Sequence, residues 1–214
     1  MDHIKKWFYE KIANKTIEAF TKNGFKATYF ETKEEAINHF IENAKNYESI
    51  GFGGSITVVK ELKLVEEAKK LNKKVLNHGD PNLTPEERNQ VRLAELTCDL
   101  FVTSTNALTI DGKLVNIDGT GNRVNAMAFG PKKTIIYTGI NKVVENVDDG
   151  IKRIKNIASP MNAKRLNFNT PCAQTGFCAD CNSPQRICRI ITIIEKNPPL
   201  SDIEVVIIGE SLGF

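Results

Sequence analysis

The middle of the chain contains the stretch Leu100-Phe-Val-Thr-Ser-Thr-Asn-Ala-Leu-Thr-Ile-Asp-Gly-Lys-Leu-Val-Asn-Ile-Asp-Gly-Thr-Gly-Asn-Arg123. Its apolar beginning predicts a short buried strand, because four apolar or β-branched residues stand before a run of polar ones. That strand ends in the polar cluster Thr103-Ser-Thr-Asn106. Ligands of open α/β sheets bind at the carboxyl ends of the strands, so this cluster predicts a binding site as well as a fold.

A β-hairpin is predicted next, because Asp111-Gly112 is a turn pair between the short runs 106–110 and 113–117. We expect this pair to serve the turn alone. The following turn, Asp118-Gly-Thr-Gly-Asn-Arg123, leads into a helix. Turn amides, a threonine hydroxyl and a guanidinium together suit a phosphate or a carboxylate. The candidate ligand-binding residues in this region are Ser104, Asn106, Asp118, Gly119, Thr120, Gly121, Asn122 and Arg123.

Helix and strand signals alternate along the rest of the chain, which predicts an α/β fold with one mainly parallel, Rossmann-like sheet covered by helices. Thr32-Lys-Glu-Glu35 and Thr84-Pro-Glu-Glu87 are capping boxes that mark two helix starts. The length suits a single domain over residues 1–214. We expect a break at Ser159-Pro160 in the helix 147–166. The other predicted elements are helices at 3–22 and 55–71 and strands at 26–30, 49–52, 74–78, 100–103, 134–137 and 204–209.

Composition narrows the classes of function. The 214 residues are 41% hydrophobic and 26% charged with a net charge of +3, which is typical of a soluble globular protein and too mild to indicate nucleic-acid binding. No apolar run approaches the ~20 residues that a membrane-spanning helix needs. The first eight residues lack the apolar core of a secretory signal. We therefore expect a cytoplasmic protein, and an oligomer is possible.

A second glycine-rich loop, Ile50-Gly-Phe-Gly-Gly-Ser-Ile-Thr57, lies between a predicted strand and a predicted helix. Glycines allow a ligand to approach the backbone, and free amides at a helix start favour an anion. It is not a complete dinucleotide-binding motif, because Ile56 stands where the third glycine belongs. A tight turn with no ligand is the alternative. The candidate ligand-binding residues are Gly51, Gly53, Gly54, Ser55 and Thr57.

Four of the five cysteines gather in the predicted loop 170–189, at Cys172, Cys178, Cys181 and Cys188. Four thiolates suit zinc or an iron–sulfur cluster. Two disulfides are the alternative, which an intracellular protein would not keep oxidised. The spacing is not that of a bacterial ferredoxin, and a zinc ribbon normally has two close pairs. We expect an iron–sulfur cluster, [4Fe–4S], with zinc as the second choice, and a buried structural thiol at Cys98.

The region from Thr103 to Gly130, followed by Pro-Lys-Lys-Thr-Ile-Ile-Tyr-Thr-Gly-Ile-Asn-Lys142, resembles the lactate-utilisation (LUD) domain family. The loop Gly53-Gly-Ser-Ile-Thr57 and the segment 206–214 fit the same family. The resemblance implies the sugar-phosphate isomerase and coenzyme A transferase-like fold. It also implies a link to the oxidation of lactate to pyruvate, with iron–sulfur redox proteins as partners, and the two glycine-rich loops predict that the chain binds a small anionic metabolite.

Other functions remain open at this point. The rhythm around Thr105-Asn-Ala-Leu is also similar to methylthioribose-phosphate isomerases and to the regulatory subunits of translation initiation factor 2B. Asn106 stands where those isomerases have an acid–base aspartate, which disfavours that chemistry. A scaffold subunit with structural zinc is one alternative, and a hydrolase or transferase acting on a phosphorylated or thioester substrate is another, although no nucleophile is evident. His78 beside Asp80 is a general base, a metal ligand or, more commonly, a loop residue. Lys132, Lys133 and Lys142 either face an anion or are solvated.

Overall fold

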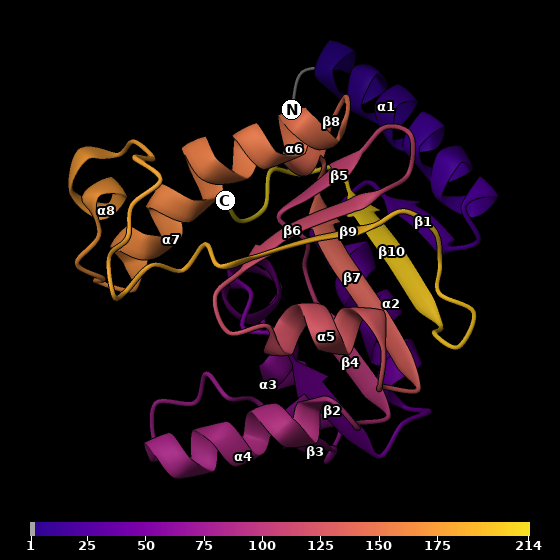
Figure 1. Cartoon of the computed structure of the whole chain (residues 1–214). Coiled ribbons are helices and arrows are strands. Elements are labelled where there is room, and N and C mark those ends of the chain that lie inside the picture. The colour runs from indigo at the N-terminus through magenta and orange to yellow at the C-terminus, as the bar shows by residue number, and fades with distance from the viewer. Residues whose placement is uncertain (1–2) are drawn as a thin grey trace.

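The computed structural model describes residues 3–214, and two β-sheets organise it (Figure 1). Each neighbouring pair of strands in the larger sheet runs parallel. The predicted α/β class with a mainly parallel sheet is therefore confirmed. Across this sheet the strands follow the order β1 (Lys26–Phe30), β10 (Ile203–Ile208), β7 (Lys133–Gly139), β4 (Leu100–Thr103), β2 (Ser49–Phe52) and β3 (Lys74–Leu76).

Helices begin where the sequence predicted capping boxes. The Thr32 hydroxyl accepts from the Glu35 amide at 3.3 Å, while the Glu35 carboxylate accepts from the Thr32 amide at 3.0 Å. Thr84 and Glu87 form the same reciprocal pair. These bonds satisfy amides at the helix start that have no partner within the helix. The helices are α1 (His3–Lys22), α2 (Lys33–Ala44), α3 (Leu64–Lys70), α4 (Pro85–Glu95), α5 (Asn122–Ala128), α6 (Val147–Arg153), α7 (Ser159–Arg165) and α8 (Pro171–Thr175).

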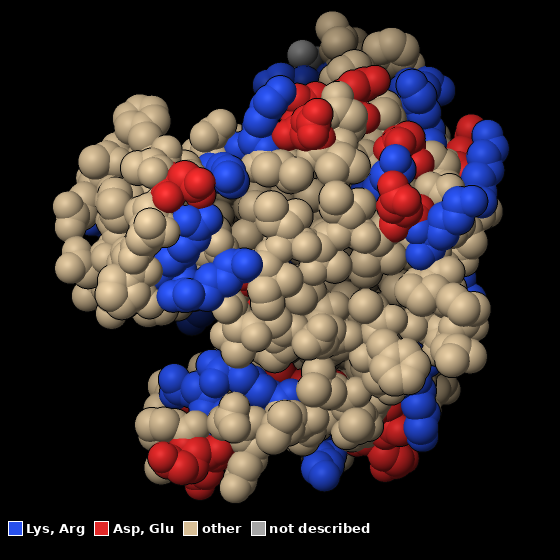
Figure 2. Space-filling view, viewed as in Figure 1, with Lys and Arg blue, Asp and Glu red and all other residues tan. Residues whose placement is uncertain are grey.

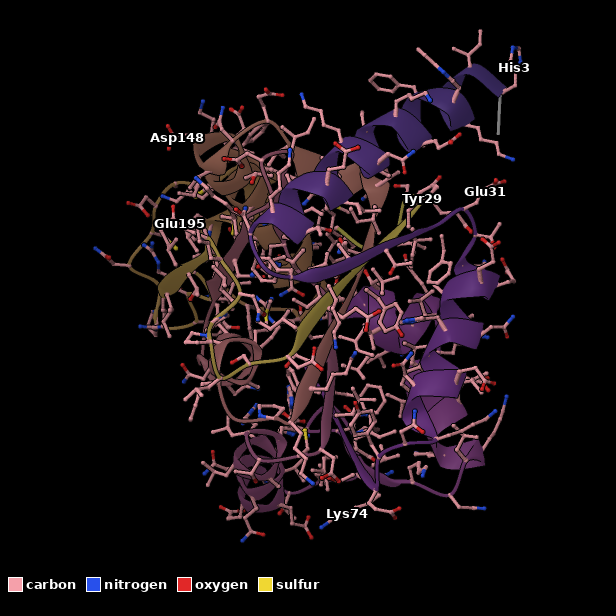
Figure 3. The ribbon with its side chains drawn as sticks, turned by 90° about the vertical axis from the view of Figure 1, so that its right-hand side faces the viewer. His3, Tyr29, Glu31, Lys74, Asp148 and Glu195 are labelled. Atoms are coloured by element: carbon pink, nitrogen blue, oxygen red, sulfur yellow. The ribbon has the colours of Figure 1, made fainter. Side chains whose placement is uncertain are left out.

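Both faces of the larger sheet are covered, because its strands are apolar on both sides. In β10, Val206 and Ile208 belong to the core that includes α2 and α3, whereas Val205 and Ile207 belong to the core that includes α1 and α5. This alternation follows from the two-residue period of a strand. Figure 3 shows α1 and α2 on either side of the strand that carries Tyr29. The arrangement leaves the two ends of the strands as the places where polar groups gather.

At the amino ends of the strands, charged side chains are paired. Buried Glu204, near the start of β10, lies 2.6 Å from the ammonium of Lys133 and 3.0 Å from Nε2 of His39. Burial opposes ionisation, yet hydrogen bonds from His39 and Lys133 hold the pKa of Glu204 at about 2. Asp99 pairs with Lys132 at 2.6 Å, and that bond lowers the pKa of Asp99 well below its usual range. At this edge of the sheet the carboxylates of Glu204 and Asp99 are neutralised by neighbouring basic side chains.

A second, smaller sheet was not predicted, although its central hairpin was. The antiparallel pairing of β5 and β6 confirms the hairpin around Asp111-Gly112. The run Ile190-Ile-Thr-Ile-Ile194 forms a strand antiparallel to β6, and this pairing brings Ile190 opposite Asp118. The segment that follows the cysteines therefore returns beside the predicted binding turn. In order, this sheet contains β8 (Val143–Val144), β5 (Ala107–Thr109), β6 (Leu114–Asp118) and β9 (Ile190–Ile194).

Two predicted helices differ in the structure. The helix predicted over 55–71 is a π-helical turn, η1 (Thr57–Glu61), separated from α3 by Lys63 in a left-handed conformation with φ of 52°. The break predicted at Ser159-Pro160 is absent, because α6 continues through a second π-helical turn, η3 (Ile154–Ala158), into α7. Pro160 lacks the N–H that would continue the helical ladder, and the backbone widens in the preceding turn instead of ending.

None of the helices in residues 3–214 is both long and apolar enough to cross a membrane.

Candidate functional site

A cavity of about 610 Å³ opens at the carboxyl ends of the parallel strands. It lies between α4 and α7, and Figure 2 shows lysine and arginine side chains gathered on both rims of the hollow there. Both glycine-rich loops reach it, as the rule for strand ends predicts. The loop after β2 contributes residues 53–57, and the polar end of β4 contributes residues 104–106.

Eleven of the thirteen predicted ligand-binding residues line this cavity, and two do not. Gly51 lies within β2, where a side chain would come 2.8 Å from the Cys98 sulfur, so its small size serves packing. Gly121 precedes α5 with φ of 93° and serves the turn. The residues that line the cavity as expected are Gly53, Gly54, Ser55, Thr57, Ser104, Asn106, Asp118, Gly119, Thr120, Asn122 and Arg123.

Backbone and side chain approach each other closely in the first loop. A side chain at Gly53 would place its Cβ 2.4 Å from the hydroxyl of Thr103, and Gly54 has φ of +68°. Only glycine meets both requirements without strain. The space beside Gly54 is taken by the imidazole of His78, whose Nε2 would lie 3.1 Å from an added Cβ. The loop therefore places its main chain against the cavity and against His78.

The Arg123 guanidinium is bound by side chains and carbonyls of the protein. Its Nε lies 3.2 Å from the Asp118 carboxylate, and its two terminal nitrogens donate to the side-chain oxygens of Asn116 and Asn106 at 2.6 and 3.0 Å. They also donate to the carbonyls of Ser104 and Ile117. These acceptors account for all five N–H groups of a guanidinium. The geometry favours a role in fastening the hairpin to the end of β4 over direct contact with a ligand.

The side-chain oxygen of Asn106 is already hydrogen-bonded within the protein. Its Oδ1 accepts from Arg123 at 3.0 Å and from the Ile117 amide at 3.1 Å. The Asn106 backbone amide in turn donates to Asn116 at 3.1 Å. Among the side-chain atoms of Asn106, the Nδ2 hydrogens make no hydrogen bond within the described residues. The side chain can therefore donate a hydrogen bond to an anion.

Lys142, immediately before β8, is the cation at the base of the cavity. It is 4% exposed, and its ammonium donates to the hydroxyls of Thr57 and Ser104, each at 3.1 Å. Burial is the largest effect on it, Arg153 and Arg123 act in the same direction, and together they lower the pKa of Lys142 to about 7. The sequence offered two interpretations of this lysine, and burial excludes the solvated one.

His78 faces the cavity, and its partner is Glu95 rather than the neighbouring Asp80. The His78 Nδ1 lies 2.8 Å from each carboxylate oxygen of Glu95, and the His78 backbone amide donates to the same carboxylate at 3.0 Å. Glu95 is 1% exposed, on the last turn of α4. A carboxylate on Nδ1 fixes an imidazole in the tautomer that leaves Nε2 free to accept a proton. Nothing in the sequence marks Glu95 as its partner.

Three further arginines line the cavity and were not predicted. Arg88 and Arg92 lie one turn apart on α4, and the Nε of each is buried without a hydrogen-bond partner in the described part of the chain. Arg165, on α7, donates within residues 3–214 to the Asn162 side chain alone. The i, i+4 spacing of two arginines on one helix was a signal available in the sequence. With Lys142, these arginines make the cavity cationic.

The four clustered cysteines line one small pocket together, beside Lys155 and Arg186. Cys172 lies on α8, which Gly176 ends, rather than on the predicted loop. All five cysteines are free thiols. Burial raises the pKa of Cys188, and the neighbouring Cys178 and Cys172 thiols add to this effect.

The donor set and the geometry of this pocket point in different directions. In residues 3–214 no group of three or more His, Cys, Asp or Glu side chains converges as a single ion would require. The space between the thiols is about 20 Å³, close to the volume of one water or one ion. Four soft ligands with two cations nearby fit a metal–thiolate centre chemically. In the segment between the cysteines Phe177 and Asp180 are exposed, and Asp180 pairs with Arg186 at 2.8 Å.

The cysteine pocket and the large cavity share a wall. Ser159 and Ile187 line both, and the Cys188 thiol donates to the Ser159 hydroxyl at 3.1 Å. The pairing of β9 with β6 holds this wall in place, since it fixes the segment after Cys188 beside Asp118. A group bound by the four cysteines would therefore be a neighbour of a ligand in the cavity.

Comparisons with known proteins give a family and a fold. The chain is similar to a crystal structure of a DUF162 family protein from Deinococcus radiodurans, with a TM-score of 0.53 and 15% identity over 94% of this chain and 98% of that one. At that identity the likeness shows the fold alone. No curated protein was found to match. The family model of the LUD domain matches residues 13–208, which cover both glycine-rich loops, the cysteines and both sheets, and the chain therefore belongs to the LUD domain family.

Proposed function

We propose that this chain binds a small anionic metabolite in the large cavity, within a pathway of lactate or another 2-hydroxy acid, and that Cys172, Cys178, Cys181 and Cys188 hold an iron–sulfur centre. One observation carries the first half of the proposal. Four cations of the cavity, Arg88, Arg92, Lys142 and Arg165, have no carboxylate within 4.0 Å in residues 3–214.

Unpaired cations in a partly buried site are costly, and an anionic ligand would remove that cost. Asp118, the acidic residue that lines the cavity, does not serve this purpose because it is paired with Arg123, and Glu95, which is not part of the lining, is paired with His78. The two guanidinium groups on α4 suit a carboxylate or a phosphate, which they bind with paired hydrogen bonds. The cavity is far larger than a three-carbon acid, so longer 2-oxo acids and sugar phosphates belong among the candidates.

The proposal for the cysteines rests on their donor chemistry and their placement. A zinc ion would draw all four sulfurs to about 2.3 Å from one point, whereas each cysteine of a [4Fe–4S] cluster binds a different iron. The four thiolates suit either group, so the cluster is the first choice of this proposal and zinc is its alternative. When bound, a cluster would exchange single electrons, so iron–sulfur redox proteins are the proposed partners. Reduced thiols suit a cytoplasmic location.

Calorimetric titration tests the ligand half of the proposal. We expect lactate, pyruvate or a sugar phosphate to bind the native chain, and Arg92→Ala to weaken binding by roughly ten- to a hundredfold, because a charge-assisted hydrogen bond contributes about 1.5–3 kcal/mol. Lys132→Ala is the matched control, since Lys132 lies at the opposite end of the strands beside Asp99. If none of the three ligand classes binds, or if Arg92→Ala binds as tightly as the native chain, the cavity is not the anion site.

Metal analysis of anaerobically purified protein tests the second half. A cluster gives brown protein with broad visible absorbance, together with iron and acid-labile sulfide, whereas zinc gives colourless protein with one metal ion. We expect Cys178→Ser and Cys181→Ser to lose the metal, because a hydroxyl is a poor substitute for a thiolate. Cys98→Ala, distant from the cluster of cysteines in the sequence, should keep it. Unchanged metal content in the serine variants would remove the assignment.

A further inference from the structure

Two buried lysines differ in their partners: Lys133 begins β7, and Lys142 lies three residues beyond the other end of that strand. Lys133 is 7% exposed and lies 2.6 Å from the carboxylate of Glu204. Lys142 is 4% exposed, and the acceptors found for it in the described chain are two hydroxyls, those of Thr57 and Ser104. An ordinary structural lysine resembles the first. Lys142 instead has no carboxylate partner within the described residues, so its amine can react with a ligand.

The charges around Lys142 come from several elements. Arg153 on α6 and Arg123 on α5 disfavour its protonated form, and Glu61 at the end of η1 favours it. Burial outweighs all three, so the pKa of Lys142 falls to about 7. A pKa of about 7 leaves a far larger share of Lys142 as free amine at neutral pH than the ordinary pKa of 10.5 would. A free amine in a cavity is a nucleophile toward carbonyl carbon.

The cavity also supplies what a carbonyl substrate needs for positioning. Arg88 and Arg92 offer a site for a carboxylate, and neither has a carboxylate partner within the described residues. The Thr57 and Ser104 hydroxyls hold the amine from two different loops. The chain closes in from a third side, because a Cβ added at Gly213 would lie 3.0 Å from the Lys142 nitrogen. Lys142 lines the cavity, and its amine is held there by contacts from three parts of the chain.

We propose that Lys142 forms a Schiff base with a 2-oxo acid bound in the cavity. This inference rests on the proposed function, since it requires the carboxylate of the substrate to bind there. The Nζ lone pair adds to the C2 carbonyl carbon, and the carbonyl oxygen leaves as water together with the two hydrogens of the amine. The product is an imine between Nζ and C2, a reversible step that needs no oxidant or reductant.

Reductive trapping with pyruvate as the probe tests the proposal. Full-length protein is incubated with pyruvate and sodium cyanoborohydride, which reduces an imine to a stable secondary amine, and peptide mass mapping then locates the adduct. We expect the adduct on Lys142, with a rate that rises as pH increases through about 7, where the free amine forms. An adduct spread over exposed lysines, or absent from Lys142, overturns the proposal. The mapping uses the native chain, so it does not depend on the folding of a variant.

Variants separate the nucleophile from the charge. Lys142→Arg keeps the positive charge and Lys142→Met keeps the approximate size, and we expect each to lower trapping at least about a hundredfold, because neither supplies a free amine. Lys132→Arg, which removes an exposed lysine on the other edge, should trap at the native rate. Calorimetry with pyruvate on the native chain is run in parallel. Binding without trapping defeats the Schiff base alone, whereas absence of binding defeats the anion site on which it depends.

Discussion

Both ends of the parallel sheet carry charged groups, but the charges are paired at one end and lack carboxylate partners at the other. At the amino ends, Glu204 is bound by Lys133 and His39, and Asp99 by Lys132. At the carboxyl ends, Lys142 and the arginines of α4 face a cavity without carboxylate partners in the described chain. Unpaired buried charge lowers stability, so an end that retains it has another use for it. We call the end with paired charges the structural end, and the end that carries the candidate site the functional end.

Arg123 gives the strongest test of this comparison, because it lies at the functional end but has partners for its guanidinium group. We expect Arg123→Ala to lower the free energy of unfolding by about 4 kcal/mol, since it leaves the Asp118 carboxylate and several acceptors unsatisfied. Chemical denaturation measures this. Arg189→Ala, on the exposed side of the cysteine segment, is the control. A loss below about 1 kcal/mol would return Arg123 to the ligand-contacting role predicted from sequence.

Glu204→Gln should lower the free energy of unfolding at pH 7 by about 3 kcal/mol, because it removes the shared partner of Lys133 and His39. The pKa of Glu204 is about 2 in the folded chain and 4.5 in the unfolded one. This stabilisation is therefore fully present above pH 4.5 and is lost as pH falls toward 2. Denaturation between pH 2 and 7 should show a smaller loss in the variant than in the native chain, because Asp99, whose pKa is also lowered on folding, still titrates in both. The matched control is Glu195→Gln at an exposed position, and an equal loss there would contradict the network.

Lys142→Met should act in the opposite direction and raise the free energy of unfolding at pH 6 by about 2 kcal/mol, because it removes a buried ammonium without a counter-charge. The pKa of Lys142 falls from 10.5 to about 7 on folding, so the unfolded chain binds more protons between these values. The stability of the native chain should then rise with pH across this window, and that of the variant should rise less. Lys133→Met, the matched change at the paired end, should destabilise. If both variants lose stability equally, the two ends do not differ.

The smallest effect is expected at an exposed pair of the structural end. Lys26 and Asp202 lie 3.1 Å apart, with side chains 64% and 40% exposed. We expect Lys26→Ala to change the free energy of unfolding by less than about 0.5 kcal/mol, because water and salt screen such pairs. Urea denaturation of this variant and of Glu204→Gln compares an exposed ion pair with a buried one at similar distance. A loss as large as that of Glu204→Gln would show that closeness, and not burial, sets the contribution of these pairs.

Local signals and the rule for strand ends were enough to predict much of this molecule. The capping boxes at Thr32 and Thr84 and the hairpin at Asp111 need only neighbours in sequence. Parallel strands end on one edge, so the convergence of the loops after Phe52 and Thr103 was also predictable.

Pairings over long separations were not predictable. Glu95 reaches His78 across 17 positions, and Lys142 reaches Thr57 across 85. The helical and strand periods of the sequence give no information about contacts between residues so far apart. The strand 190–194 was different, because five β-branched residues did signal it, although it follows directly on the cysteine segment.

The order of strands has a consequence for the time course of synthesis. Strand β10 lies between β1 and β7 (Figure 1), and Lys26 pairs with Glu204, 178 positions later (204 − 26). On a ribosome, β1 and β7 thus remain without their shared neighbour until β10 has been made. Long-range parallel pairing is slow, and unpaired apolar strand edges are prone to aggregation. The nascent chain therefore passes through an incomplete sheet whose open edges a chaperone would have reason to cover.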